Sequence, residues 1–136
     1  MTKKVFFACL FLLSCLFVQA QTLRSSNNAT VGKIESDGTV RNSNNATVAR
    51  ISSNGDIRDA SNRLIARISS NGDIRDASNR YLGKVESNGT VRNSNNASIG
   101  KVENDGTVRD DSNRTIGYAR GVPKTYAAVC FLFHLF

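Results

Sequence analysis

The chain has 136 residues, of which 40% are hydrophobic, 7% aromatic and 21% charged, and its net charge is +7 at pH 7. This length suits one domain, and the excess of bases permits an anionic partner without requiring one. Only one of the three cysteines, Cys130, lies outside the first twenty residues, which excludes an internal disulfide once that segment is removed.

Residues 1–20 have the pattern of a secretory signal peptide. The basic start MTKK precedes the apolar run VFFACLFLLSCLFV, and VQA ends in a small residue suited to signal peptidase. We predict cleavage after Ala20, a periplasmic or secreted location, and no transmembrane span in the mature chain. A lipid anchor on Cys15 is the second interpretation, which the apolar run beyond that cysteine disfavours. Cleavage leaves sixteen basic residues, eleven acidic ones and a net charge of +5.

Residues 21–120 form a β-hairpin repeat domain with a period of seventeen residues. A half unit precedes the repeats at 22–30, and another follows them at 116–120. Short repeats of this kind bury the apolar side of each unit against its neighbours. The five full units are VGKIESDGTVRNSNNAT (31–47), VARISSNGDIRDASNRL (48–64), IARISSNGDIRDASNRY (65–81), LGKVESNGTVRNSNNAS (82–98) and IGKVENDGTVRDDSNRT (99–115).

Each unit predicts two short strands rather than a helix. Gly after Asn or Asp marks one turn, an Asn-rich corner marks the other, and Val and Ile dominate the positions between them. The first and fourth positions are both apolar although their spacing is odd, which indicates a bulge or bend between them. A tight turn at the corner would place Ile57 opposite Ile65.

Two pairs of positions vary together across the units. Glu at the fifth position comes with Thr at the ninth, as in Glu35 and Thr39, whereas Ser at the fifth comes with Asp at the ninth. Asp at the twelfth position comes with Arg at the sixteenth, as in Asp59 and Arg63. The first covariation predicts that the pair stands across a three-residue loop that ends on a left-handed Gly. The second predicts that its pair spans the Asn-rich corner, whose invariant Asn tolerates left-handed backbone better than most residues.

The half units predict how the array ends. Residues 22–26 have the pattern of a second strand and 116–120 that of a first strand, so their pairing would close the array and remove its raw edges. The apolar tail, residues 121–136, holds every Phe of the mature chain. Its last nine residues, from Ala128, are apolar on both faces, which favours a buried strand. The predicted fold is all-β: a closed, roughly five-fold array of short hairpins with the C-terminal strand or tail packed at its core.

The whole mature chain resembles the five-fold β-flower proteins that Gram-negative bacteria export. The likeness rests on repeats such as IGKVENDGTVRDDSNRTIG, between a signal peptide and an apolar aromatic tail. It implies a closed, roughly five-fold array of hairpins, and it brings no established activity and no site residues. This chain has five Gly turns but six Asn-rich corners.

A double row of cations is the most distinctive candidate site. Hairpin register places the third position of each unit opposite the eleventh, and like charges directly opposed are destabilising. One interpretation is an outward stripe that binds an anionic polysaccharide or another envelope component. The favoured one is a solvated face neutralised by flanking acids such as Glu35 and Asp56. The stripe comprises Lys33, Arg41, Arg50, Arg58, Arg67, Arg75, Lys84, Arg92, Lys101 and Arg109.

No other group of residues predicts chemistry. Cys130 and His134 could meet only on a helix and have no acid nearby, so core packing is favoured over a catalytic pair. Acids near the Gly turns follow from turn chemistry and predict no metal site. We therefore expect no catalytic residue, no cofactor and no nucleic-acid partner. The expected function is a non-enzymatic structural or interaction module of the cell envelope, with binding of an anionic glycan as the alternative.

Overall fold

The computed structural model describes residues 21–136. The predicted signal peptide and the alternative lipid anchor at Cys15 lie outside the described residues. Within 21–136 the chain forms twelve short strands and one helix, α2 (Lys124–Phe131). Within these residues, no helix is long and apolar enough to cross a membrane.

The strands are four or five residues long and follow the repeat. Each unit contributes a strand on either side of its Gly turn, as its Val and Ile content predicts. The strands are β1 (Gln21–Ser25), β2 (Thr30–Ile34), β3 (Thr39–Asn42), β4 (Thr47–Ile51), β5 (Asp56–Asp59), β6 (Leu64–Ile68), β7 (Asp73–Asp76), β8 (Tyr81–Val85), β9 (Thr90–Asn93), β10 (Ser98–Val102), β11 (Thr107–Asp110) and β12 (Thr115–Tyr118).

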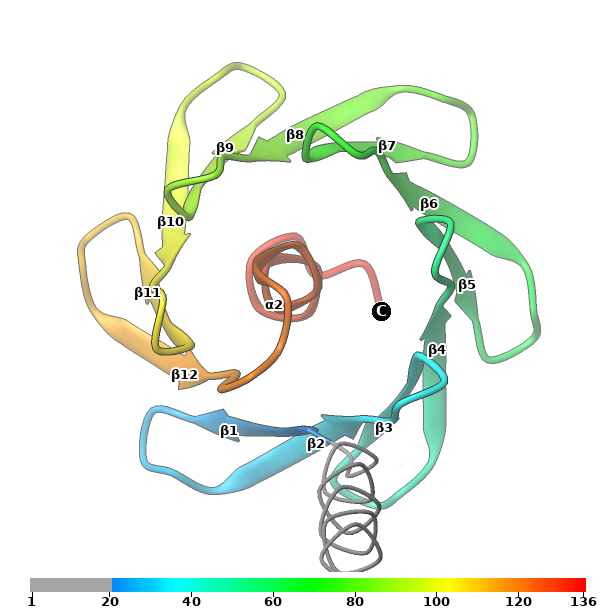
Figure 1. Cartoon of the computed structure of the whole chain (residues 1–136), viewed down its shortest axis with the longest axis horizontal. Coiled ribbons are helices and arrows are strands. Elements are labelled where there is room, and N and C mark those ends of the chain that lie inside the picture. Colours follow the sequence, from blue (N-terminus) through cyan, green and yellow to red (C-terminus); the bar gives the residue numbers. More distant parts are fainter. Residues whose placement is uncertain (1–20) are drawn as a thin grey trace, which may run out of the picture.

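All twelve strands join in one closed antiparallel ring, in chain order, with β1 next to β12 (Figure 1). At the seam Arg24 pairs with Tyr118 and Ser25 with Gly117, so the predicted closure by the two half units is confirmed. Between neighbouring strands, six Asn-rich corners point outward like petals and five Gly turns close the other ends. The seam stands where a sixth Gly turn would be.

Both turn types have the predicted left-handed residue. The five Gly of the Gly turns have φ between 91° and 95°, and the six corner Asn have φ between 66° and 70°. In the first Gly turn the backbone N–H of Glu35 donates to Thr39 and that of Gly38 to Glu35, which leaves a three-residue loop. Gly and Asn adopt this conformation at lower cost than other residues, which explains why neither position varies.

A bulge beside every corner corrects one sequence prediction. Ile57 pairs with Ala66 rather than with Ile65, because the register shifts by one residue between Ile57 and Arg58. The extra residue of the bulge is the apolar first position, which in five of the six corners packs against the core together with the fourth. The exception is Val31, which is 42% exposed. The bulge thus explains how two apolar positions three residues apart serve one interior.

The C-terminal tail packs inside the ring, as predicted, but it is a helix rather than a strand. A strand needs a neighbour for its backbone hydrogen bonds, and the closed ring offers no free edge. A helix satisfies those groups within itself. Pro123 stands immediately before α2, and Ala127, Ala128 and Val129 of the helix are fully buried.

The helix lies against one side of the ring interior. It packs most closely on β8, β10 and β11. Its last residues and those just after it reach the second position of three units, where Gly leaves room for them: Phe131 lies at Gly117, Leu132 at Gly100 and Phe133 at Gly83. At Gly100 an added Cβ would be 2.8 Å from Leu132.

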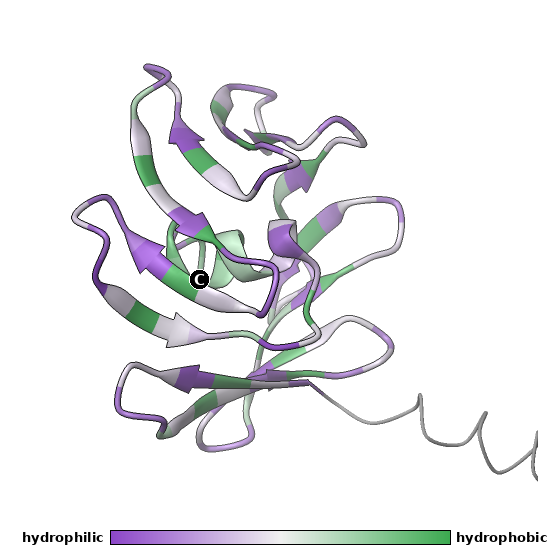
Figure 2. Ribbon diagram, turned by 60° about the vertical axis from the view of Figure 1, so that its left-hand side comes forward, coloured by the Kyte–Doolittle hydropathy of each residue, from purple (hydrophilic) through white to green (hydrophobic). Residues whose placement is uncertain are grey.

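Residue volume around the ring compensates for this placement. The second, fourth and tenth positions face inward, and in the units beside the helix they are Gly, Val and Val. In the second and third units the same positions are Ala, Ile and Ile, including the fully buried Ala49 and Ala66. Larger side chains thus line the second and third units, which lie on the side of the ring away from the helix. This arrangement favours dense packing of the interior. Figure 2 shows the apolar helix inside strands whose turns are hydrophilic.

We expect Gly100→Ala to lower the free energy of unfolding by about 1–3 kcal/mol, because the added methyl overpacks the contact with Leu132. Gly32→Ala is the matched control. Its Cβ would meet the same close backbone neighbour as that of Gly100, a carbonyl oxygen, but no side chain. Ala49 and Ala66 show that the ring accepts a methyl at this position. Urea unfolding of both variants measures the difference. An equal loss of stability in the two variants would contradict the packing of the tail described above.

Candidate functional site

The ten residues of the cation stripe lie in the predicted register. The third and eleventh positions face each other in all five hairpins, as Lys33 and Arg41 do in the first. These positions alternate with the inward ones, so the stripe follows the outer face of the ring. The two rows nevertheless differ in what their side chains contact.

The eleventh-position row has a structural role. Each arginine extends toward the neighbouring corner, where its Nη1 donates to the carbonyl oxygen of the left-handed Asn at 3.2–3.3 Å. Arg24 makes the same bond in the first half unit, at 3.1 Å. We name Arg41, Arg58, Arg75, Arg92 and Arg109 the corner arginines.

Flanking acids form ion pairs with four of the five corner arginines: Arg41, Arg58, Arg92 and Arg109. Where the fifth position is Glu, its carboxylate pairs with the corner arginine of the same hairpin, as Glu103 does with Arg109 at 2.8 Å. Where the acid has moved to the ninth position, Asp56 lies 3.7 Å from Arg58 and 3.3 Å from Arg67. Asp56 therefore also reaches a cation of the next hairpin.

The third-position row is more accessible to solvent. Arg50, Arg67 and Lys101 are exposed, and Lys33 and Lys84 are half-buried. Arg50 lies 3.5 Å from Asp37, but the side chains of both residues are more than half exposed. A long ion pair in water contributes little, so these side chains can reorient toward another anion.

The corners hold a second set of charges. Asp59 accepts hydrogen bonds from the backbone N–H groups of Ser61 and Arg63, each at 2.9 Å, and from Arg63 Nε at 3.0 Å. The backbone N–H of Arg63 is the main cause that lowers the pKa of Asp59; desolvation opposes this, and the guanidinium adds to the lowering. Asp76 with Arg80 and Asp110 with Arg114 repeat this arrangement, which confirms the predicted covarying pairs.

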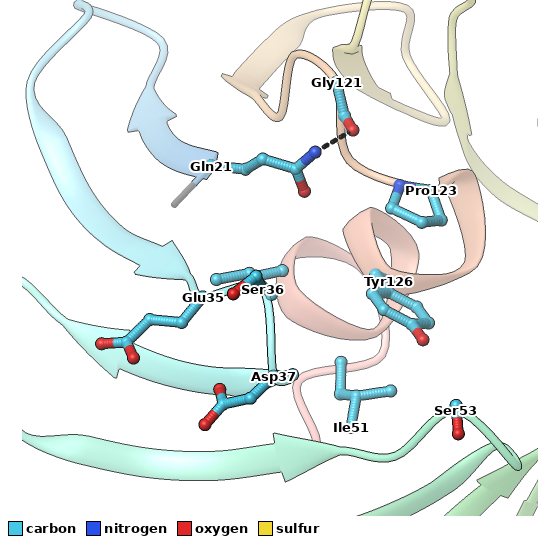
Figure 3. Close-up of a pocket in the computed structure, with 11 residues that line it drawn as sticks. Gln21, Glu35, Ser36, Asp37, Ile51, Ser53, Gly121, Pro123 and Tyr126 are labelled. Atoms are coloured by element: carbon cyan, nitrogen blue, oxygen red, sulfur yellow. Dashed lines mark hydrogen bonds between the residues drawn. The ribbon is translucent and has the colours of Figure 1, made fainter. Parts of the chain in front are cut away.

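A pocket of about 580 Å³ lies at the seam, between the start of α2 and the first two Gly turns. Ile34 and Ile51 contribute apolar side chains to its lining. Pro123 and Tyr126 line it from the helix side (Figure 3). Gln21 extends toward the loop before the helix, where its Nε2 donates a hydrogen bond to the carbonyl oxygen of Gly121 (Figure 3). We name this hollow the seam pocket.

Sequence analysis did not identify the seam pocket, although one signal was present. The first half unit starts at the ninth position with Thr22, so Gln21 stands at the eighth, where every full unit has Gly. That substitution marks the place where the sixth Gly turn is cut open. Tyr126 carried no signal, because its position in the pocket depends on the tail being a helix.

Cys130 and His134 lie in different surroundings. Cys130 lies on α2, where burial raises the pKa of its thiol to about 12, so the thiol is protonated at neutral pH. His134 follows the end of the helix, has a φ of 50° and is exposed, which corrects its predicted place in the core. Within residues 21–136 no three His, Cys, Asp or Glu side chains are grouped to hold a metal ion.

Comparison with known proteins identifies a family whose members are described by their fold. The family model described as "5-fold beta-flower protein" matches residues 20–135, which is essentially the whole part of the chain that the structure describes. Neither a curated protein nor a solved structure matches the chain.

The corner carboxylates make stability sensitive to acid. Because their pKa values are lowered on folding, they stabilise the fold above the ordinary value of 3.8 and lose this contribution as the pH falls through the lowered values. Converting all three corners to the Asn and Ala of the first unit should reduce the loss of thermal stability between about pH 5 and pH 2. Circular dichroism melts measure it, and an unchanged acid sensitivity would contradict the assignment. The substitutions are Asp59→Asn, Arg63→Ala, Asp76→Asn, Arg80→Ala, Asp110→Asn and Arg114→Ala.

Proposed function

The chain belongs to the 5-fold beta-flower family, and we propose that this member is an exported, non-enzymatic interaction module of the cell envelope. The composition of the seam pocket is the observation that carries the proposal. Its walls contain neither His, Cys, Lys nor Arg, so they offer no imidazole or thiol and no cation to stabilise an oxyanion. The two carboxylates of the lining, Glu35 and Asp37, point away from Tyr126 and pair with Arg41 and Arg50. A concave surface without such groups is suited to binding rather than to chemistry.

The closed ring supports a role outside the cytoplasm. Pairing of β1 with β12 removes the free strand edges that would invite aggregation. The described chain needs no disulfide, since Cys130 is its only cysteine. Together with the signal-peptide pattern of residues 1–20, these features describe a compact scaffold that stays folded after export.

Export is tested by expressing the full chain in a Gram-negative host and fractionating the cells. We expect the protein in the periplasmic, envelope or secreted fraction, with an intact mass that begins at Gln21. Ala20→Arg is the control, because it removes the small residue that signal peptidase requires and should leave the longer chain. A wild-type protein that stays in the cytosol with residues 1–20 attached would contradict the proposal.

A second candidate function is binding of an anionic glycan through the third-position row. The exposure of Arg50, Arg67 and Lys101 favours it, because the corner arginines opposite them are engaged within the chain. Contacts of this kind are screened by salt, so the salt concentration that releases the protein from an anionic matrix measures their strength.

For this second function we expect Arg50→Glu/Arg67→Glu/Lys101→Glu to elute from immobilised heparin at much lower salt than wild type. The matched control reverses three corner cations and changes the net charge by the same amount: Arg63→Glu, Arg80→Glu and Arg114→Glu. Their side chains are 79–81% exposed, more than those of Arg50 and Arg67 at 56% and 59%, so the control tests net charge on a surface that is at least as accessible. Equal losses of retention in both variants would show that only net charge matters and would exclude the row as a site.

A further inference from the structure

We propose that the seam pocket binds an uncharged saccharide of about disaccharide size. This inference deepens the proposed function, on which it rests, by naming the ligand class of a surface that the repeat pattern does not predict. Three observations carry it: why the pocket exists, which chemical groups line it, and where its charges point.

The pocket exists because α2 is anchored to one side of the ring. Lys124 Nζ at the start of the helix donates to the carbonyl oxygen of Ser87 at 3.3 Å and to Oδ1 of Asn104 at 2.6 Å, which ties it to the fourth and fifth Gly turns. The first and second Gly turns, around Ser36 and Ser53, face the opposite side of the helix start. The resulting volume of about 580 Å³ lies within the range of about 300–1,000 Å³ typical of small-ligand sites.

The lining combines an apolar platform with hydroxyl and amide groups. The ring of Tyr126 and the buried Ile51 offer an apolar surface suited to the C–H face of a pyranose, which packs on aromatic rings. Tyr126 and Ser53 add hydroxyl groups that both donate and accept hydrogen bonds. Gln21 uses Nε2 on Gly121, while its Oε1 points into the hollow as an acceptor (Figure 3). Sugar hydroxyls, which also donate and accept, complement this set.

The charges at the rim favour an uncharged ligand. Glu35 and Asp37 line the pocket, but their carboxylates point away from Tyr126 (Figure 3) and pair with Arg41 and Arg50. An anionic ligand would therefore find no cation on the pocket walls and two carboxylates beside it. A cation in the hollow would gain little from those carboxylates, because both point away from Tyr126. A neutral, hydroxyl-rich molecule brings no charge that would be buried without a partner.

The chain contains its own matched control for a test. Residues 49–63 and 66–80 are identical in sequence, so Ser53 and Ser70 occupy equivalent places in two equal Gly turns. Only Ser53 lines the seam pocket, while Ser70 lines a separate hollow. Ser53→Tyr should fill the seam pocket, and Ser70→Tyr should leave it open at the same cost to the turn. Tyr126→Phe removes one hydroxyl and keeps the apolar platform.

The experiment titrates the full purified protein with cellobiose, maltose and N,N′-diacetylchitobiose at millimolar concentration and follows backbone amides by NMR. We expect at least one disaccharide to shift the amides of Gly38, Ser53 and Gly121. Affinity should fall about tenfold or more in Ser53→Tyr, stay unchanged in Ser70→Tyr and fall severalfold in Tyr126→Phe. Melting curves of the two serine variants should coincide, which would attribute the difference to the pocket.

Three outcomes would overturn the inference: no amide shift with any of the three sugars, equal weakening in both serine variants, or tighter binding of a uronic-acid disaccharide at the same amides. None of them bears on export, which cell fractionation decides separately. Conversely, a chain that stays in the cytosol and still binds cellobiose through the seam pocket would refute the proposed function and leave the site in place.

Discussion

The structure depends on the pairing of β1 with β12, because this contact turns a row of hairpins into a ring. Every strand then has two neighbours, and the sheet has no edge to protect. Closure also creates an interior that the small aliphatic residues of the repeats do not fill, and it denies the apolar tail a strand to pair with. The tail enters that interior as a helix because only a helix satisfies its own backbone there.

In a ring of near-identical units, a central helix could pack against any side. Small differences in side-chain volume at the inner positions decide which side it contacts. Gly and Val at the inner positions of the fourth and fifth units admit Leu132 and Phe133, whereas Ala and Ile fill the second and third. Lys124 adds a polar anchor on the same side. The seam pocket on the other side is a consequence of this packing, so the architecture of the core and the candidate site have one cause.

The charges on the outer face show how register divides similar residues into different roles. Corner arginines and third-position cations stand opposite each other in every hairpin, as in the pair Arg109 and Lys101. The eleventh position lies next to a left-handed Asn whose carbonyl needs a donor, so Arg109 bonds to Asn113. The third position has no such neighbour, which leaves Lys101 in solvent. Of the ten cations, the five corner arginines therefore have a structural role.

The sequence by itself determined the hairpin register, the left-handed Gly and Asn of the turns, the pairing of Asp59 with Arg63 and the closing of the ring by its half units. These features follow from contacts between residues close in the chain or from complementary ends, and the repeats serve as an internal alignment for them. Only the tertiary structure decided that the tail is helical, that Ile57 meets Ala66, and that Gln21 and Tyr126 share a pocket. Each of these depends on which distant groups the closed ring brings together and on which backbone partners it has already used.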